Sequence, residues 1–134
     1  MSHRFGPQLI GQTEKTLNAL LESILAGRLT EPEWVALRLA DMLHQEVTSS
    51  AALIGEVVER AHFESADVLV ESLTTAGLLS NGRLTEEGRT VVSQIQAEIG
   101  ERTGSVWEDL PPEDVAAATR VLIEVMSRAR AALT

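Results

Sequence analysis

The forty residues from Ser49 to Gly88 constrain the fold of this chain more than any other segment. Two short helical patterns follow one another there, and a very small hairpin sequence, Leu78–Thr85, comes directly after them. The Asn81-Gly82 pair at its centre is the preferred sequence for a type I′ turn. We therefore expect two short helices and then a hairpin with arms of only two or three residues.

The second helix of this segment, from about Glu64 to Thr75, has two distinct faces. One face carries apolar residues at helical spacing, namely Ala66, Leu69, Val70 and Leu73. The opposite face carries Glu64, Asp67, Val68 and Glu71 at the same spacing. Helix, turn, helix and two-stranded wing is the order of a winged helix-turn-helix module, which usually places its second helix in the DNA major groove.

Four further helices are expected around this segment, which makes the predicted fold mainly α. Pro7 opens a first helix that runs to about Ala26, and Thr30-Glu31-Pro32-Glu33 is a capping box that starts a second. Ser49 or Ser50 can cap the first helix of the segment above, and Thr85 caps a long helix that continues toward Trp107. A final helix begins at Pro111-Pro112.

The final helix carries an apolar stripe that is longer than a small winged core needs. Together with the first helix, it suggests a dimer interface. The candidate dimerisation residues are Leu17, Leu21, Leu122, Val125, Met126, Ala129 and Leu133. We expect a single domain over residues 1–134, with a winged helix-turn-helix core at 30–88 and dimerisation helices at 7–27 and 89–133.

Composition excludes several classes of function. The chain has no cysteine, which rules out disulfides and thiolate metal sites, and no histidine spacing resembles a zinc site. No nucleophile elbow or phosphate-binding glycine loop is present, so we expect neither an enzyme nor a cofactor. Without an apolar run that could span a membrane or act as a signal peptide, the expected location is the cytoplasm.

Charge opposes the architecture. Residues 31–88 hold three arginines against eleven carboxylates, a net charge of −8 compared with −9 for the whole chain. A protein that binds duplex DNA gains most of its affinity from Lys and Arg that neutralise phosphates. The outward face of the predicted second helix of the segment has three carboxylates and no base.

Several stretches together resemble the MarR family of bacterial winged helix-turn-helix regulators. The matching segments are Leu29–Leu37, Leu69–Leu79, Leu84–Arg89, Leu110–Asp114 and Arg120–Leu122. The resemblance covers essentially the whole chain. It implies a homodimer built from the terminal helices, two recognition helices that read a near-palindromic DNA site, and often a small-molecule pocket between the dimer part and the DNA-binding part.

The chain departs from the family pattern in two places. The family usually has a longer wing with an Asp-Arg motif and basic tip residues, whereas here the tip is Ser80-Asn81-Gly82-Arg83. The family also tends to carry threonine and arginine where this chain has Asp67 and Val68. Both departures lower the expected affinity for DNA.

Two hypotheses follow. In the first, the chain is a homodimeric MarR-like transcriptional regulator that responds to a small molecule and binds double-stranded DNA weakly or with strong salt dependence. Its candidate DNA-binding residues are Arg60, Ser65, Asp67, Val68, Glu71, Arg83 and Arg89. In the second, it is an interaction or sensing protein that keeps the dimeric scaffold and uses its acidic face without DNA.

Each of these residues also has a simpler interpretation. The arginines and the acidic face can be ordinary solvated surface. Trp34 and His44 are candidates for a ligand pocket, but Trp34 is also a natural core anchor, and Asp41 and His44, one helical turn apart, can form a surface pair.

Overall fold

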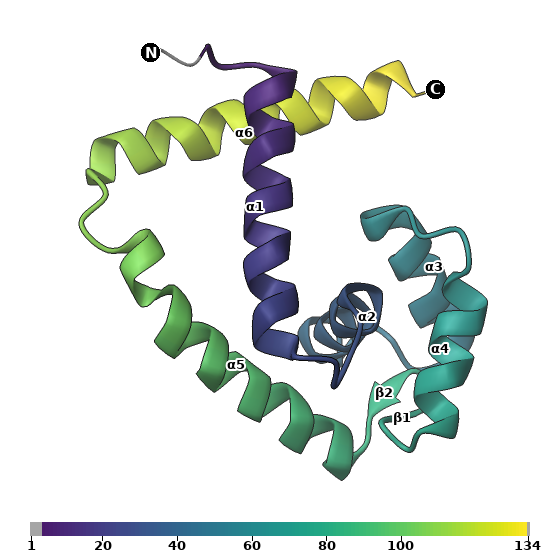
Figure 1. Ribbon diagram of the computed structural model, residues 1–134. Helices are drawn as coiled ribbons and strands as arrows, with labels where there is room; N and C mark the ends of the chain where they lie inside the picture. Colours follow the sequence, from purple (N-terminus) through teal and green to yellow (C-terminus); the bar gives the residue numbers. More distant parts are fainter. Residues whose placement is uncertain (1–3, 134) are drawn as a thin grey trace. The chain divides into compact units, whose positions relative to one another are not determined.

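The computed structural model describes residues 4–133 and is mainly helical, as predicted (Figure 1). Its elements are α1 (Pro7–Leu25), α2 (Glu31–Met42), α3 (Ser50–Ala61), α4 (Ala66–Thr75), β1 (Leu79–Ser80), β2 (Arg83–Leu84), α5 (Glu86–Trp107) and α6 (Pro112–Ala132). The chain divides into two compact units, and the boundary lies inside α5 between Arg102 and Thr103. The predicted dimerisation region, 89–133, begins earlier in the sequence and stays a prediction.

Helix starts follow the predicted caps. The Thr30 side chain accepts from the Glu33 amide at 3.2 Å, and the Glu33 carboxylate accepts from the Thr30 amide at 2.8 Å, so the capping box of α2 is confirmed. Ser49 caps α3 by accepting from the Ala52 amide at 3.1 Å. Thr85 accepts from the Gly88 amide at 3.0 Å at the start of α5.

The predicted start of α4 at Glu64 is wrong by two residues. His62 ends α3 in the left-handed conformation with φ 57°, and the chain needs three further residues before helical geometry resumes at Ala66. The Ser65 side chain makes no capping hydrogen bond. Nothing in the local spacing of apolar residues distinguishes this turn from a first helical turn.

The β1–β2 hairpin is as short as the sequence predicts. Leu79 pairs with Leu84 and Ser80 pairs with Arg83, which leaves Asn81 and Gly82 as the two-residue turn. Asn81 has φ 53° and Gly82 has φ 78°, the two positive values that a type I′ turn requires. A Cβ atom on Gly82 would overlap the backbone carbonyl of Ser49, so the turn lies directly against the start of α3.

The unit that ends at Arg102 has a continuous apolar core. Helix α3 packs on α2 and α4, β1 packs on α4, and β2 packs on α2. Every element from α1 to α5 except β2 contributes at least one fully buried side chain. The largest are Leu25, Leu37, Leu53, Val57, Val70, Leu73, Leu79 and Ile95. This core explains why the three central helices and the hairpin hold one arrangement.

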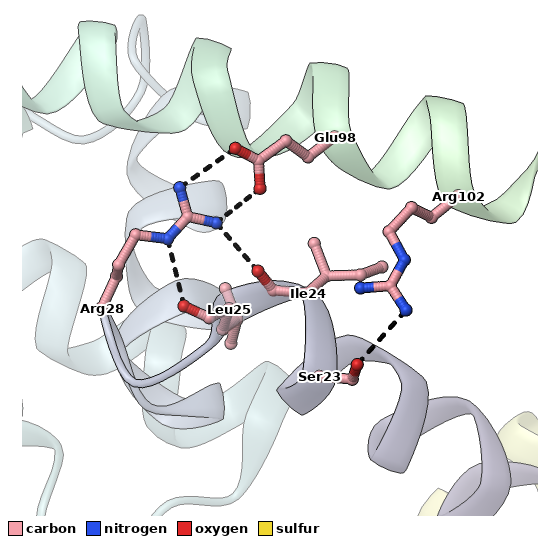
Figure 2. Close-up of polar contacts among 6 residues, drawn as sticks. All are labelled: Ser23, Ile24, Leu25, Arg28, Glu98 and Arg102. Carbon is pink, nitrogen blue, oxygen red and sulfur yellow. Dashed lines mark hydrogen bonds and ion pairs between the residues drawn. The ribbon is translucent and has the colours of Figure 1, made fainter.

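A guanidinium group joins the end of α1 to α5 (Figure 2). The Arg28 side chain donates to the backbone carbonyls of Ile24 at 2.8 Å and Leu25 at 3.1 Å, at the C-terminus of α1, and the Leu25 carbonyl also accepts from the Arg28 amide at 3.0 Å. The same group forms a two-pronged ion pair with Glu98 of α5, with its Nη atoms 3.2 and 2.6 Å from the two carboxylate oxygens. We call this group of contacts the Arg28 clamp.

The unit that begins at Thr103 is organised differently. Its main element is α6, which starts with proline in its first turn and the acidic residues Glu113 and Asp114, as predicted. None of the 21 residues of α6 is buried. Within residues 4–133, no helix has both the length and the apolar character that a membrane span requires.

Candidate nucleic-acid interface

Helix α4 separates a packed face from an exposed one. Ala66, Val70 and Leu73 are buried, each with 1% exposure. Asp67, Val68 and Glu71 are exposed, and Val68 keeps 60% of its surface accessible. The exposed face therefore takes no part in the core and is available for recognition.

The exposed face of α4 is acidic in its N-terminal half and carries uncharged Ser72, Thr74 and Thr75 in the rest. Helix α4 contains Asp67 and Glu71 and no Lys or Arg, and Glu64 and Ser65, both exposed, immediately precede it. Serine can donate to or accept from a base or a phosphate, and a carboxylate can accept from the cytosine amino group. A duplex on this face would need positive charge from other elements to hold it.

Arg60, a candidate phosphate contact, is already engaged. Its Nε atom donates to Glu56 Oε2 at 2.7 Å, one helical turn away on α3. This hydrogen bond is the first cause that raises the pKa of Arg60 above its usual value. The charge of Arg60 is therefore largely balanced within its own helix.

Arg83 and Arg89 are brought together by the hairpin and the first turn of α5. With Asp41, His44 and Leu84 they line a recess of about 190 Å³, which we call the arginine recess. Arg89 Nη1 donates to the Leu84 carbonyl at 3.3 Å. Within residues 4–133, neither Arg83 nor Arg89 forms an ion pair with a carboxylate.

The other polar groups of the arginine recess are paired with neighbours. The Asp41 carboxylate accepts from Arg38 Nη1 at 3.3 Å, and His44 Nδ1 lies 3.0 Å from the Asp41 backbone carbonyl. Among the described residues that line this recess, Asp41 is the single acid, and it forms an ion pair with a third arginine. The sequence suggested Asp41 and His44 as neighbours, and the contact is through the backbone of Asp41.

The two candidate ligand-pocket residues have different surroundings. His44 is exposed and lines the arginine recess. Trp34 has 6% exposure in the core cluster and is not among the residues that line this recess. The Arg38 guanidinium carbon lies 6.0 Å from the Trp34 ring centroid, so the indole supports the arginine that neutralises Asp41.

A second recess, of about 530 Å³, lies where the α3–α4 turn meets the start of α2; we call it the Phe63 recess. Phe63, Val68 and Leu69 give it apolar character, and the carboxylate residues Glu33 and Glu64 also line it. No sequence pattern predicts this recess. Its residues come from two helix starts and a turn that share no periodicity. The one sequence signal is the bulky aromatic Phe63 between two helices.

The candidate dimerisation residues are mostly exposed. Leu21 packs against the core of the first unit, whereas Leu17 keeps 36% of its surface accessible. On α6 the exposed fractions are 41% for Leu122, 40% for Val125, 51% for Met126 and 74% for Leu133. Ala129 is exposed as well.

No protein-family model, no curated protein and no solved structure matches this chain.

Proposed function

We propose that the chain is a homodimeric DNA-binding transcriptional regulator of the MarR type. In this proposal α3 and α4 are the helix-turn-helix, the β1–β2 hairpin is a shortened wing, and α6 pairs with its copy in a second protomer. The observation that carries the proposal is the division of α4 into a face packed on α2 and α3 and a face that is exposed. A recognition helix needs this division, because one side must be held rigidly while the other enters the groove.

Helix α6 supports the dimer. Its apolar residues recur at helical spacing along the helix, and none of its residues is buried. A contiguous exposed apolar stripe of this length favours an interface over solvent exposure. Pairing with a second copy would bury it, and a two-fold dimer places two reading helices on one duplex.

Arg83 and Arg89 support the contact with DNA. They lie beside one another on β2 and in the first turn of α5, and no carboxylate within residues 4–133 pairs with them. A dimer would present four such groups to the phosphates. Since the exposed face of α4 is acidic, we expect modest affinity that depends strongly on salt.

The test is selection from a random duplex library followed by fluorescence anisotropy at low salt. We expect an enriched duplex with a Kd below about 1 μM, tighter than ordinary non-specific binding. Arg83→Gln with Arg89→Gln should weaken binding at least about tenfold, and the matched control Arg128→Gln, which removes a charge from α6, should not. If the folded protein enriches no duplex, the proposal is contradicted.

A second candidate is an interaction protein that keeps the scaffold without binding DNA. Two observations favour it: the absence of any cation on α4, and the Phe63 recess, whose apolar residues are accompanied by Glu33 and Glu64. Asp67→Thr with Val68→Arg should then create DNA affinity in a protein that has none. An operator bound by the native chain would exclude this candidate.

A further inference from the structure

The arginine recess is a concentration of positive charge in a strongly acidic protein. The chain has 20 carboxylate side chains and 11 Lys and Arg residues. Within residues 4–133, four arginines form ion pairs: Arg28, Arg38, Arg60 and Arg128. Arg83 and Arg89 form none, although carboxylates outnumber cations, and both line the same recess.

The hydrogen-bond donors of this recess remain largely uncommitted. A guanidinium group has five N–H donors in a planar fork that matches the oxygens of a phosphate or carboxylate. Arg89 uses one donor on the Leu84 carbonyl, and no hydrogen bond from the Arg83 side chain to residues 4–133 is found. The His44 ring also lines the recess and adds a third nitrogen-bearing side chain.

Among the described residues that line the recess, Asp41 is the acid that would repel an anion, and its carboxylate is hydrogen-bonded to Arg38. Its carboxylate accepts from Arg38 at 3.3 Å, and Arg38 is itself held over the Trp34 ring. The repulsion that Asp41 exerts on an occupant of the recess is therefore reduced.

We propose that the arginine recess binds a small divalent oxyanion of the phosphate type, either free phosphate or the monophosphate group of a small molecule. The volume of about 190 Å³ decides the size of the occupant, because it lies below the range of roughly 300–1,000 Å³ typical of drug-sized ligands. Two adjacent guanidinium groups favour two negative charges over one.

The binding step does not depend on DNA binding. A consequence follows only if the proposed function also holds: Arg83 and Arg89 would then serve both the small anion and the DNA backbone. An anion in the recess would withdraw both arginines from the duplex and lower its affinity, so anion binding and DNA binding would oppose one another.

The experiment is a titration of the full chain with inorganic phosphate at constant ionic strength, followed by backbone amide NMR. We expect saturable shifts that are confined to residues 41–44 and 82–89. Acetate at the same concentration should bind at least about tenfold more weakly, because it carries a single charge. Shifts that never saturate, or equal affinities for acetate and phosphate, would overturn the proposal.

Matched variants locate the site. Arg83→Gln and Arg89→Gln should each weaken phosphate binding about tenfold, Asp41→Asn should strengthen it several-fold, and Arg128→Gln should leave it unchanged. Spectra that keep the native dispersion show that each variant is folded. Unchanged phosphate binding in Arg89→Gln would contradict the assignment.

Phosphate binding and DNA binding can fail separately. Saturable phosphate binding without any enriched duplex supports the phosphate site and contradicts the proposal that the chain is a DNA-binding regulator. An enriched duplex with no saturable phosphate binding contradicts the phosphate site and is consistent with the regulator proposal.

Discussion

Helices α4 and α6 carry similar amphipathic patterns and have opposite surroundings. Helix α4 has 10 residues and buries Ala66, Val70 and Leu73 against its own chain. Helix α6 has 21 residues and buries none. The periodicity of apolar residues specifies which face avoids water, but whether the same chain or another covers that face depends on the elements that lie nearby.

Leucine truncation should give the largest difference in free energy of unfolding between the core around α4 and helix α6. Leu53 has 0% exposure in the core, so Leu53→Ala should lower the free energy of unfolding by about 3 kcal/mol. Leu122 has 41% exposure, so Leu122→Ala should cost less than about 1 kcal/mol at protein concentrations where the chain is monomeric. Urea denaturation of both variants checks this, and equal costs would show that α6 is packed within the protomer.

Negative charge on the apolar face of α6 should also separate the two regions. Leu122→Asp with Met126→Asp should weaken self-association about 100-fold or more, since two apolar anchors become charged at the interface. Ser127→Asp with Ala131→Asp adds the same charge to the opposite side of the helix and is the matched control. Sedimentation velocity measures both. If the two double variants associate equally, α6 is not the interface.

Ion pairs in the two regions should also differ. The Arg28 clamp joins α1 to α5 through two hydrogen bonds between side chains, whereas Arg128 and Glu124 form a single contact at 3.2 Å within α6. Glu98→Gln should therefore lower stability by about 0.5–1 kcal/mol, and Glu124→Gln by no more than about 0.3 kcal/mol. Thermal unfolding of both variants distinguishes them, and a smaller loss for Glu98→Gln would contradict the role of the clamp.

The smallest expected effect concerns acidic residues at two helix starts. Burial, followed by repulsion from Glu14 and Glu22, raises the pKa of Glu31 at the start of α2. A raised carboxyl pKa means that the folded state holds the proton more tightly than the unfolded state. Ionised Glu31 is therefore unfavourable at neutral pH, and this cost disappears as the pH falls below the unfolded pKa of about 4.3.

Glu31→Gln should accordingly raise stability by a few tenths of a kcal/mol at pH 7 after allowance for solvent screening, with no gain near pH 4. Glu113→Gln in the first turn of α6 should lower stability by a similar amount at pH 7, because it removes a favourable interaction with the helix dipole. Unfolding curves at the two pH values measure both. The same sign for both variants at pH 7 would show that burial and repulsion do not disfavour ionised Glu31.

Local signals in the sequence predicted most of the secondary structure. The capping box at Thr30, the Ser49 cap and the Asn81-Gly82 turn each depend on a few neighbouring residues, and all three are confirmed. The predicted start of α4 is wrong because α3 ends at His62 in the left-handed conformation. No glycine stands at this position to signal the end of the helix.

The surroundings of the candidate site residues were harder to predict. Charge alone makes Arg83 and Arg89 candidates for DNA contact. Their proximity to His44, in the α2–α3 connection, depends on how the hairpin packs on α2. The engagement of Arg60 by Glu56 was visible in principle as an i, i+4 pair. The Phe63 recess required three-dimensional proximity between α2 and α4 that no short pattern contains.

The most direct test of the regulator proposal is the salt dependence of duplex binding by the native protein. Four arginines per dimer, Arg83 and Arg89 from each protomer, imply a slope of about −3 to −4 for log K against log of the salt concentration. Replacing both arginines by glutamine should remove most of that slope together with the affinity. A folded dimer that binds no duplex at low salt, or one whose slope is unchanged by both replacements, would contradict the proposal.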